Sequence, residues 1–377
     1  MTDATRKISL GLQGGGAYAA FGWGVLDRLL EDGRFDITAI SATSGGAINA
    51  SVLVDGYARG GGREGARQAL RRFWQALSGT QMFSPLRRTP VDYLAGGGSM
   101  QASPAYHLLQ MMSGMLAPGV APVGTNPLHA LLSSLIDFER VRSCEEIRLY
   151  IPATNIRTGR AKIFVRDELD ARRVAASACL PQVFAAVEVD GEAYWDGSFV
   201  GNPALSPLVD DGGSADILIV QNNPIARSQL PHNVADISNR ATEVAFNISF
   251  VREVSAIQHL GALVDEEQGE QVHAANVRLH LISGNGTLSN LDISSKFNVE
   301  WPFILQMHEA GREAASRWLD ERAEQVGVRS TLEAHEVYYP ELHAGAGAAG
   351  AAGAAYDTRD TALRERSSIS RAQPSTP

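Results

Sequence analysis

A unit of strand, tight loop and helix occurs twice within the first 60 residues and constrains the fold more than any other feature. A short apolar run, residues 8–12, leads into the glycines of "LQGGG", and apolar residues then recur at helical spacing until Gly33. A second apolar run in "FDITAISATSGG" ends at Ser44, and another helical stretch follows it. Such alternation predicts a parallel sheet with helices on its faces.

The remainder of the chain is expected to extend this sheet and its helical layers. Residues 147–156 and 161–167 form one predicted hairpin, and Asp190-Gly191 is the turn of a second. Residues 215–224 form an apolar run typical of a buried strand. Helices are expected at 64–78, 126–136, 235–263 and 301–327.

We expect one domain over residues 1–342, because a chain of 377 residues suffices for a single large α/β domain. Residues 96–127 are rich in Gly, Pro and Met, and two interpretations stay open: a lid or flap, or an ordinary helix with loops. Residues 343–377 are first rich in Gly and Ala and then polar, which predicts a flexible tail without a catalytic role.

The balance of charge excludes one class of partner. With 33 basic and 42 acidic residues the formal net charge is −9, whereas nucleic-acid binders present a basic face. No apolar run reaches the roughly 18 residues of a membrane span, and no signal-peptide core precedes the first glycines. We therefore expect a cytoplasmic protein that binds no nucleic acid; its oligomeric state is left open.

The stretch "SATSGGAINA" is close to the G-x-S-x-G turn that carries the nucleophile of many hydrolases. Ser44 would stand between strand and helix, with Gly46 as the second small residue and Ala42 in the place of the first glycine. The alternative is that Ser44 only caps a helix, since serine is a favoured N-cap. The stretch alone does not decide between a nucleophile and a cap.

The glycine loop "GLQGGGAYAAFG" is no nucleotide fingerprint. It does not match G-x-G-x-x-G, and it lacks the G-K-[ST] of a P-loop. Gly14, Gly15 and Gly16 at a helix start present backbone N–H groups without side chains, as an oxyanion hole requires. A loop that merely packs tightly is the alternative.

A nucleophilic serine needs a base, and the nine histidines lie in no supporting motif. The strongest acidic candidate is Asp196 in "AYWDGSFVGNPAL", although an aspartate before glycine is often only a turn former. Paired with Ser44, Asp196 would form a Ser–Asp dyad in which the carboxylate takes the serine proton directly. Because no cysteines, histidines and carboxylates have ligand spacing, we expect neither a metal nor a cofactor.

Taken together, "GGG", "TSGG", "ASACLPQVFAAVEVDGEAYWDGSFVGNP" and "DILIVQNNP" resemble the patatin-like phospholipases over about residues 7–320. The resemblance implies a three-layer α/β fold with a mostly parallel central sheet between helices. It implies a dyad acyl hydrolase with Ser44 as nucleophile, Asp196 as base and Gly14–Gly16 as oxyanion hole. The chain departs from the family pattern at Ala42, at Ser198 and at Tyr18-Ala19, where a basic residue and a glycine are common.

The expected substrate is a carboxylic ester of a lipid, as for a phospholipase A or lysophospholipase. Another hydrophobic ester, such as a storage polyester, is an alternative, and so is a patatin fold that has lost its chemistry and only binds lipid or a partner. The Met- and Leu-rich segment 96–127 would cover an acyl-chain groove or touch a lipid surface, so peripheral membrane association belongs to the same expectation.

Overall fold

The chain forms an eight-stranded sheet within the part that is described by the computed structural model. The described residues are 5–80, 87–108, 127–181, 183–227, 230–231, 233–263, 276–332 and 336–337, all within one compact unit. The strands are β1 (Arg6–Leu12), β2 (Phe35–Ala42), β3 (Arg148–Asn155), β4 (Ala161–Val165), β5 (Val187–Val189), β6 (Glu192–Trp195), β7 (Asp216–Gln221) and β8 (Arg278–Ser283).

Five of these strands run parallel and form the middle and one side of the sheet. The order is β5-β6-β3-β2-β1-β7-β8, with β4 also pairing with β3, and the neighbours among β3, β2, β1, β7 and β8 are all parallel. Both predicted hairpins are confirmed, since β3 and β4 pair antiparallel, as do β5 and β6. Asp190 and Gly191 both have positive φ, as the tight hairpin turn requires.

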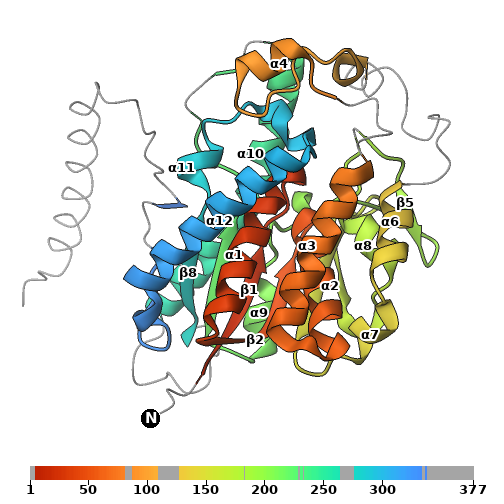
Figure 1. Ribbon diagram of the computed structural model, residues 1–377. Helices are drawn as coiled ribbons and strands as arrows, with labels where there is room; N and C mark the ends of the chain where they lie inside the picture. Colours follow the sequence, from red (N-terminus) through yellow and green to blue (C-terminus); the bar gives the residue numbers. More distant parts are fainter. Residues whose placement is uncertain are drawn as a thin grey trace, which may run out of the picture. The chain divides into compact units, whose positions relative to one another are not determined.

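Helices cover both faces of the sheet. Figure 1 shows α1, α2, α3 and α12 in front of the strands, and neighbours among them are in contact. The helices are α1 (Ala19–Asp32), α2 (Gly45–Gly56), α3 (Gly62–Thr80), α4 (Pro90–Ala95), α6 (Pro127–Leu135), α7 (Phe138–Ser143), α8 (Ala171–Ser177), α9 (Ser206–Asp211), α10 (Val234–Leu263), α11 (Asn285–Leu288) and α12 (Trp301–Glu321).

The period-two alternation of the strands divides the core between these two layers. In β7, Leu218 and Val220 join the large cluster that includes α1, α2, α3 and α12. Ile217 and Ile219 point the other way and join a smaller cluster with α9 and α10. The three-layer α/β architecture expected from the sequence is therefore confirmed.

The end of the last helix differs most from the expected one. The last helix, expected to reach 327, ends at Glu321, and a short 3₁₀ turn, Ala323–Gln325, carries the chain onward with Ala323 buried. Within 96–127, residues 96–108 and Pro127, the first residue of α6, are described; Met100 and Tyr106 are buried there, and Leu108 is exposed. The rest of that segment and the expected tail 343–377 lie outside the described residues.

Candidate active site

Ser44 stands at the turn between β2 and α2. Its φ of 55° and ψ of −123° lie in a region that residues with side chains rarely adopt, and the residue is 8% exposed. The backbone N–H of Ser44 donates to the hydroxyl of Ser177 at 3.1 Å, which holds the turn from the side of α8. Strain at a residue held by its surroundings is typical of a nucleophile elbow.

The two residues flanking the serine differ in how much room they have. A Cβ at Gly46 would lie 2.6 Å from the carbonyl oxygen of Leu12, so only glycine fits where α2 passes β1. Ala42 is fully buried, opposite Leu12 in the parallel pairing of β2 with β1, and its methyl group belongs to the large core cluster. The methyl group that Ala42 has in place of the usual glycine hydrogen thus fills space in the core.

Asp196 follows β6 and is completely buried. Its Oδ1 accepts the backbone N–H of Ser198 at 2.8 Å, while Oδ2 has no hydrogen-bond partner. Burial raises the pKa of Asp196 to about 6, although the N–H and hydroxyl of Ser198 and the hydroxyl of Ser44 each lower it. The carboxyl group therefore changes its protonation state near neutral pH, and its Oδ2 is free to accept a proton.

The glycine loop lies directly against Ser44 and against Ser198, whose N–H is bound by Asp196. A Cβ at Gly14 would lie 2.6 Å from Cβ of Ser44 and 3.3 Å from Oγ of Ser198. The backbone of Asp196 is tied to the sheet, because its carbonyl oxygen accepts the Thr154 hydroxyl at 2.7 Å. The residues singled out in the sequence as nucleophile, base and loop thus meet at one edge of the sheet, where parallel strands end.

The three glycines of the loop are not equivalent. The N–H of Gly14 donates to Asn202 Oδ1 at 2.8 Å, and its carbonyl oxygen accepts Asn223 Nδ2 at 2.8 Å. Among the described residues, no acceptor faces the N–H groups of Gly15 and Gly16, whose φ values are 142° and 58°. The open donors of the loop therefore belong to Gly15 and Gly16.

Sequence reasoning assigned no role to the polar residues that hold this loop. Asn202 and Asn223 clamp Gly14, and the Gln13 side chain binds the backbone of both segments. Ser177 braces the elbow. A signal existed, because Gln13 directly follows the apolar run of β1 and Asn223 lies in the polar "QNN" that follows the apolar run of β7, but their partners lie far away in the sequence.

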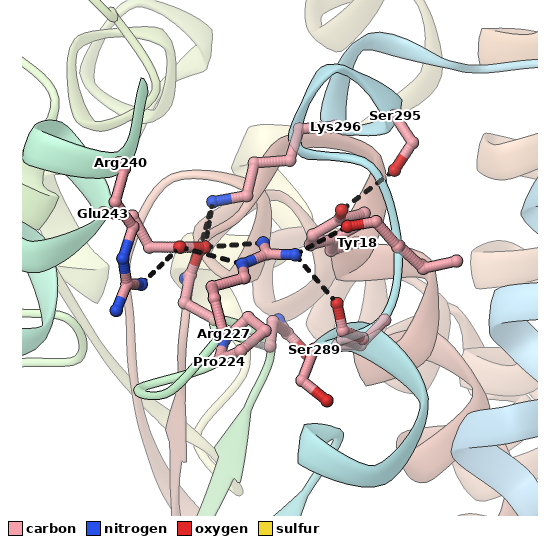
Figure 2. A network of polar contacts seen from close by, with 12 residues as sticks. Tyr18, Pro224, Arg227, Arg240, Glu243, Ser289, Ser295 and Lys296 are labelled. Carbon is pink, nitrogen blue, oxygen red and sulfur yellow. Dashed lines mark hydrogen bonds and ion pairs between the residues drawn. The ribbon is translucent and has the colours of Figure 1, made fainter. Parts of the chain in front are cut away.

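A buried ion cluster lies beside the loop. Glu243 of α10 accepts from Arg227, Arg240 and Lys296 at 2.7–3.0 Å, and Figure 2 shows these three cations converging on it. Tyr18 lies beside Arg227, and the ammonium group of Lys296 is 5.5 Å from the centre of the Tyr18 ring. Tyr18, at the position where the family often has a basic residue, is thus surrounded by cations from other segments.

The described histidines are engaged elsewhere. No hydrogen bond joins any of them to Ser44 or Asp196, so the described part of the chain offers no histidine for a triad. Their neighbours are Gln101 for His107, Ser255 for His259, Asp216 and Thr331 for His280, and Asp27 for His308, while His129 lines a surface hollow.

The fold is a three-layer α/β fold with a strained serine at the turn from β2 to α2. The family model of the patatin-like phospholipases matches residues 10–209, more than half of the chain, and the chain belongs to this family. Membership supports lipid hydrolysis as the general function. No curated protein matches the sequence.

Two solved structures are similar to the chain. VipD from Legionella pneumophila is 18% identical with a TM-score of 0.37, and the match covers 84% of this chain and 67% of VipD. The complex of ExoU with SpcU from Pseudomonas aeruginosa gives 17% identity and a TM-score of 0.34, covering 85% of this chain and 53% of the other. The chain thus spans about half the length of that neighbour.

Within the described residues, no helix combines the length and the apolar character needed to cross a bilayer.

Proposed function

We propose that the protein is a serine acyl hydrolase that cleaves carboxylic esters of lipids through a Ser44–Asp196 dyad. One observation carries the proposal. The carboxylate of Asp196 is completely buried, one of its oxygens has no hydrogen-bond partner, and the hydroxyl of the strained Ser44 lies close enough to lower its pKa. Buried carboxylate oxygens are usually hydrogen-bonded, because an unsatisfied one is costly, so an open oxygen at such depth supports a functional role.

In the first half of the reaction, Ser44 Oγ attacks the ester carbonyl carbon while its proton passes to Asp196 Oδ2. The new C–O bond gives a tetrahedral oxyanion. When this intermediate collapses, the bond to the alcohol breaks, and the proton held by Asp196 goes to the leaving alkoxide. An acyl group then remains on Ser44.

In the second half, water replaces the alcohol. Asp196 takes a proton from the water as its oxygen attacks the acyl carbon, and collapse of the second tetrahedral intermediate returns that proton to Ser44 Oγ. The carboxylic acid leaves and the enzyme is restored. The raised pKa of Asp196 suits it to both directions of proton transfer near neutral pH.

The oxyanion is held by the glycine loop. The N–H groups of Gly15 and Gly16 are the donors that support this proposal, since that of Gly14 is already donated to Asn202. Loss of one such donor typically lowers turnover by roughly 10²–10³. Donors fixed in a tight loop need no reorganisation when charge develops, which is the basis of their effect.

The substrate class rests on the family, with a surface feature in support. Apolar side chains of α4 are exposed, with Leu94 88% and Val91 62% open, and Leu108 is exposed close by in the sequence. Such side chains suit contact with the surface of a lipid aggregate, so we propose peripheral association with bilayers that contain the substrate. A soluble or polymeric hydrophobic ester remains the second candidate.

Labelling with a fluorophosphonate tests the dyad. The expected result is one adduct, located on Ser44 by peptide mass spectrometry, which is absent from Ser44→Ala and slowed in Asp196→Asn. Release of fatty acid from phospholipid vesicles, compared with that from short-chain p-nitrophenyl esters, then separates lipid from other esters. Folded protein that neither labels nor hydrolyses any ester would contradict the proposal and favour a lipid- or partner-binding role.

A further inference from the structure

A continuous row of hydrogen bonds leads from a buried lysine to the glycine loop. Lys296 Nζ donates to Asn223 Oδ1 at 3.1 Å, and Asn223 Nδ2 donates to the carbonyl oxygen of Gly14 at 2.8 Å. That carbonyl belongs to the same peptide group as the N–H of Gly15. Because an ammonium only donates and a carbonyl oxygen only accepts, the two neighbours fix the orientation of the Asn223 amide.

The members of this row are held in place from several sides. Asn223 is 1% exposed, and its own backbone N–H donates to Gln13 Oε1 at 2.9 Å. The backbone carbonyl of Lys296 abuts Gly16, where a Cβ would lie 2.6 Å away. The second hydrogen bond of the Lys296 ammonium, to Glu243 at 2.9 Å, keeps it at the end of the row.

The charge at the end of the row favours an anion at the loop. Figure 2 shows three cations around Glu243; Arg227 and Arg240 donate to Glu243 and to backbone carbonyls, whereas Lys296 donates to Glu243 and to Asn223. Hydrogen bonds in a row polarise one another, and the low dielectric of a buried site strengthens this. A donor on the Gly14 carbonyl makes the N–H of the same peptide group a stronger donor.

We propose that Lys296 and Asn223 are positioning residues that act through the Gly14–Gly15 peptide and strengthen the Gly15 N–H as a donor to the oxyanion. The inference rests on the proposed function for its catalytic consequence. The row itself is a property of the resting protein. Lys296 lies far from the glycine loop in the sequence. It thereby places a positive charge beside a loop that is followed by Tyr18, where the family often has a basic residue.

Three single variants and one double variant test the row by kinetics. Asn223→Asp keeps the shape and the bond to Lys296 but cannot donate to Gly14, and Lys296→Met removes the charge while Glu243 keeps Arg227 and Arg240. Each is expected to lower kcat roughly tenfold, less than the loss of a whole donor, with KM nearly unchanged. Lys296→Arg should recover part of the rate. The double variant should be no slower than Asn223→Asp alone, because both substitutions act through the hydrogen bond from Asn223 to the Gly14 carbonyl.

Arg240→Met is the matched control. Arg240 also binds Glu243, at 2.7 Å, and its other bond goes to the carbonyl of Ile225, so it takes no part in the row. Its kcat should stay within about twofold of the unaltered protein. An Arg240→Met defect as large as that of Lys296→Met would overturn the row and point to the stability of the ion cluster instead.

A second measurement is independent of hydrolysis. In protein labelled with ¹³C- and ¹⁵N-glycine, the amide proton of Gly15 should move upfield in Lys296→Met and in Asn223→Asp but not in Arg240→Met. A Gly15 signal that stays in place overturns the inference even if the protein is an active esterase. A Gly15 signal that moves in a protein without esterase activity upholds the row and refutes the proposed function.

Discussion

Asp196 and Glu243 are both carboxylates buried from solvent beside the glycine loop, but their surroundings shift their pKa values in opposite directions. In the described part of the chain no cation pairs with Asp196, and its Oδ2 has no hydrogen-bond partner. Burial raises its pKa to about 6. Burial alone would also raise the pKa of Glu243, but the charges of Lys296 and Arg227 outweigh it and the pKa is lowered.

The difference teaches which carboxylate is able to exchange protons. A group whose two protonation states are nearly equal in free energy near neutral pH can accept and return a proton. Glu243 stays ionised because three cations surround it, and it serves to hold the segments of Arg227, α10 and Lys296 together. Equal burial thus gives one carboxylate that can exchange a proton, which is the proposed base, and one structural anion.

Replacing the base should give the largest effect and the clearest break of this comparison. Asp196→Asn is expected to lower kcat by roughly 10²–10⁴, because no group then accepts the Ser44 proton. The same change should stabilise the fold, since the cost of an ionised buried group disappears. Steady-state kinetics and chemical denaturation at pH 8 measure both; activity within tenfold of the unaltered protein would show that Asp196 is not the base.

The sign of that stabilisation follows from the pKa. At pH values between about 4 and 6, Asp196 is protonated in the folded state and ionised in the unfolded state, so its contribution falls as pH rises. A shift of about two units corresponds to about 3 kcal/mol, and Asp196→Asn should recover up to this amount above pH 6 and nothing below pH 4.

Replacing the structural anion, Glu243, should lower the stability of the fold, whereas Asp196→Asn should raise it. Glu243→Gln leaves the buried Arg227 and the partly buried Arg240 and Lys296 without their shared counter-charge and is expected to destabilise the fold by about 3–5 kcal/mol. Chemical denaturation at pH 7 gives the value. Glu324→Gln is the control, because that carboxylate pairs with Arg6 at 75% exposure and should contribute less than about 1 kcal/mol. Equal losses from the two variants would remove the contrast between buried and exposed pairs.

The pH profile sharpens the comparison further. Since Asp196 must be ionised to accept a proton, kcat/KM should rise about tenfold per pH unit at acidic pH and level off above about 6. Ser198→Ala removes a hydroxyl that lowers the pKa of Asp196, so the midpoint should move to higher pH. A profile that levels off near pH 4 would mean that the carboxylate is not desolvated in the working enzyme.

Much of this arrangement was predictable from sequence, and the reasons are local. The strand–loop–helix units, the two hairpins and the meeting of Gly14, Ser44 and Asp196 follow from patterns that each occupy a few residues. The bonds from Asn202 and Asn223 to Gly14 join positions 188 and 209 apart, and no local pattern encodes such pairings. Lys296 lies outside every motif that suggested the family.

The smallest effect is expected at the residue that looked most irregular in the sequence. Ala42→Gly removes a buried methyl and adds backbone freedom, which together should lower stability by about 1–2 kcal/mol. Ala42 takes no part in the proposed proton transfer, so kcat/KM should stay the same or rise slightly. Thermal unfolding and ester hydrolysis check this. Abolished activity would mean that the methyl shapes the elbow as well as filling the core.

The place of β1 between β2 and β7 limits how the chain can be shortened. The family match ends at residue 209, before β7 begins, so a fragment cut there keeps Ser44, Asp196 and the three glycines. In that fragment β1 would become an apolar edge strand with open N–H and C=O groups, which invites pairing with other copies. The smallest portable unit of this protein therefore extends through β7 and β8, well beyond the stretch that identifies its family.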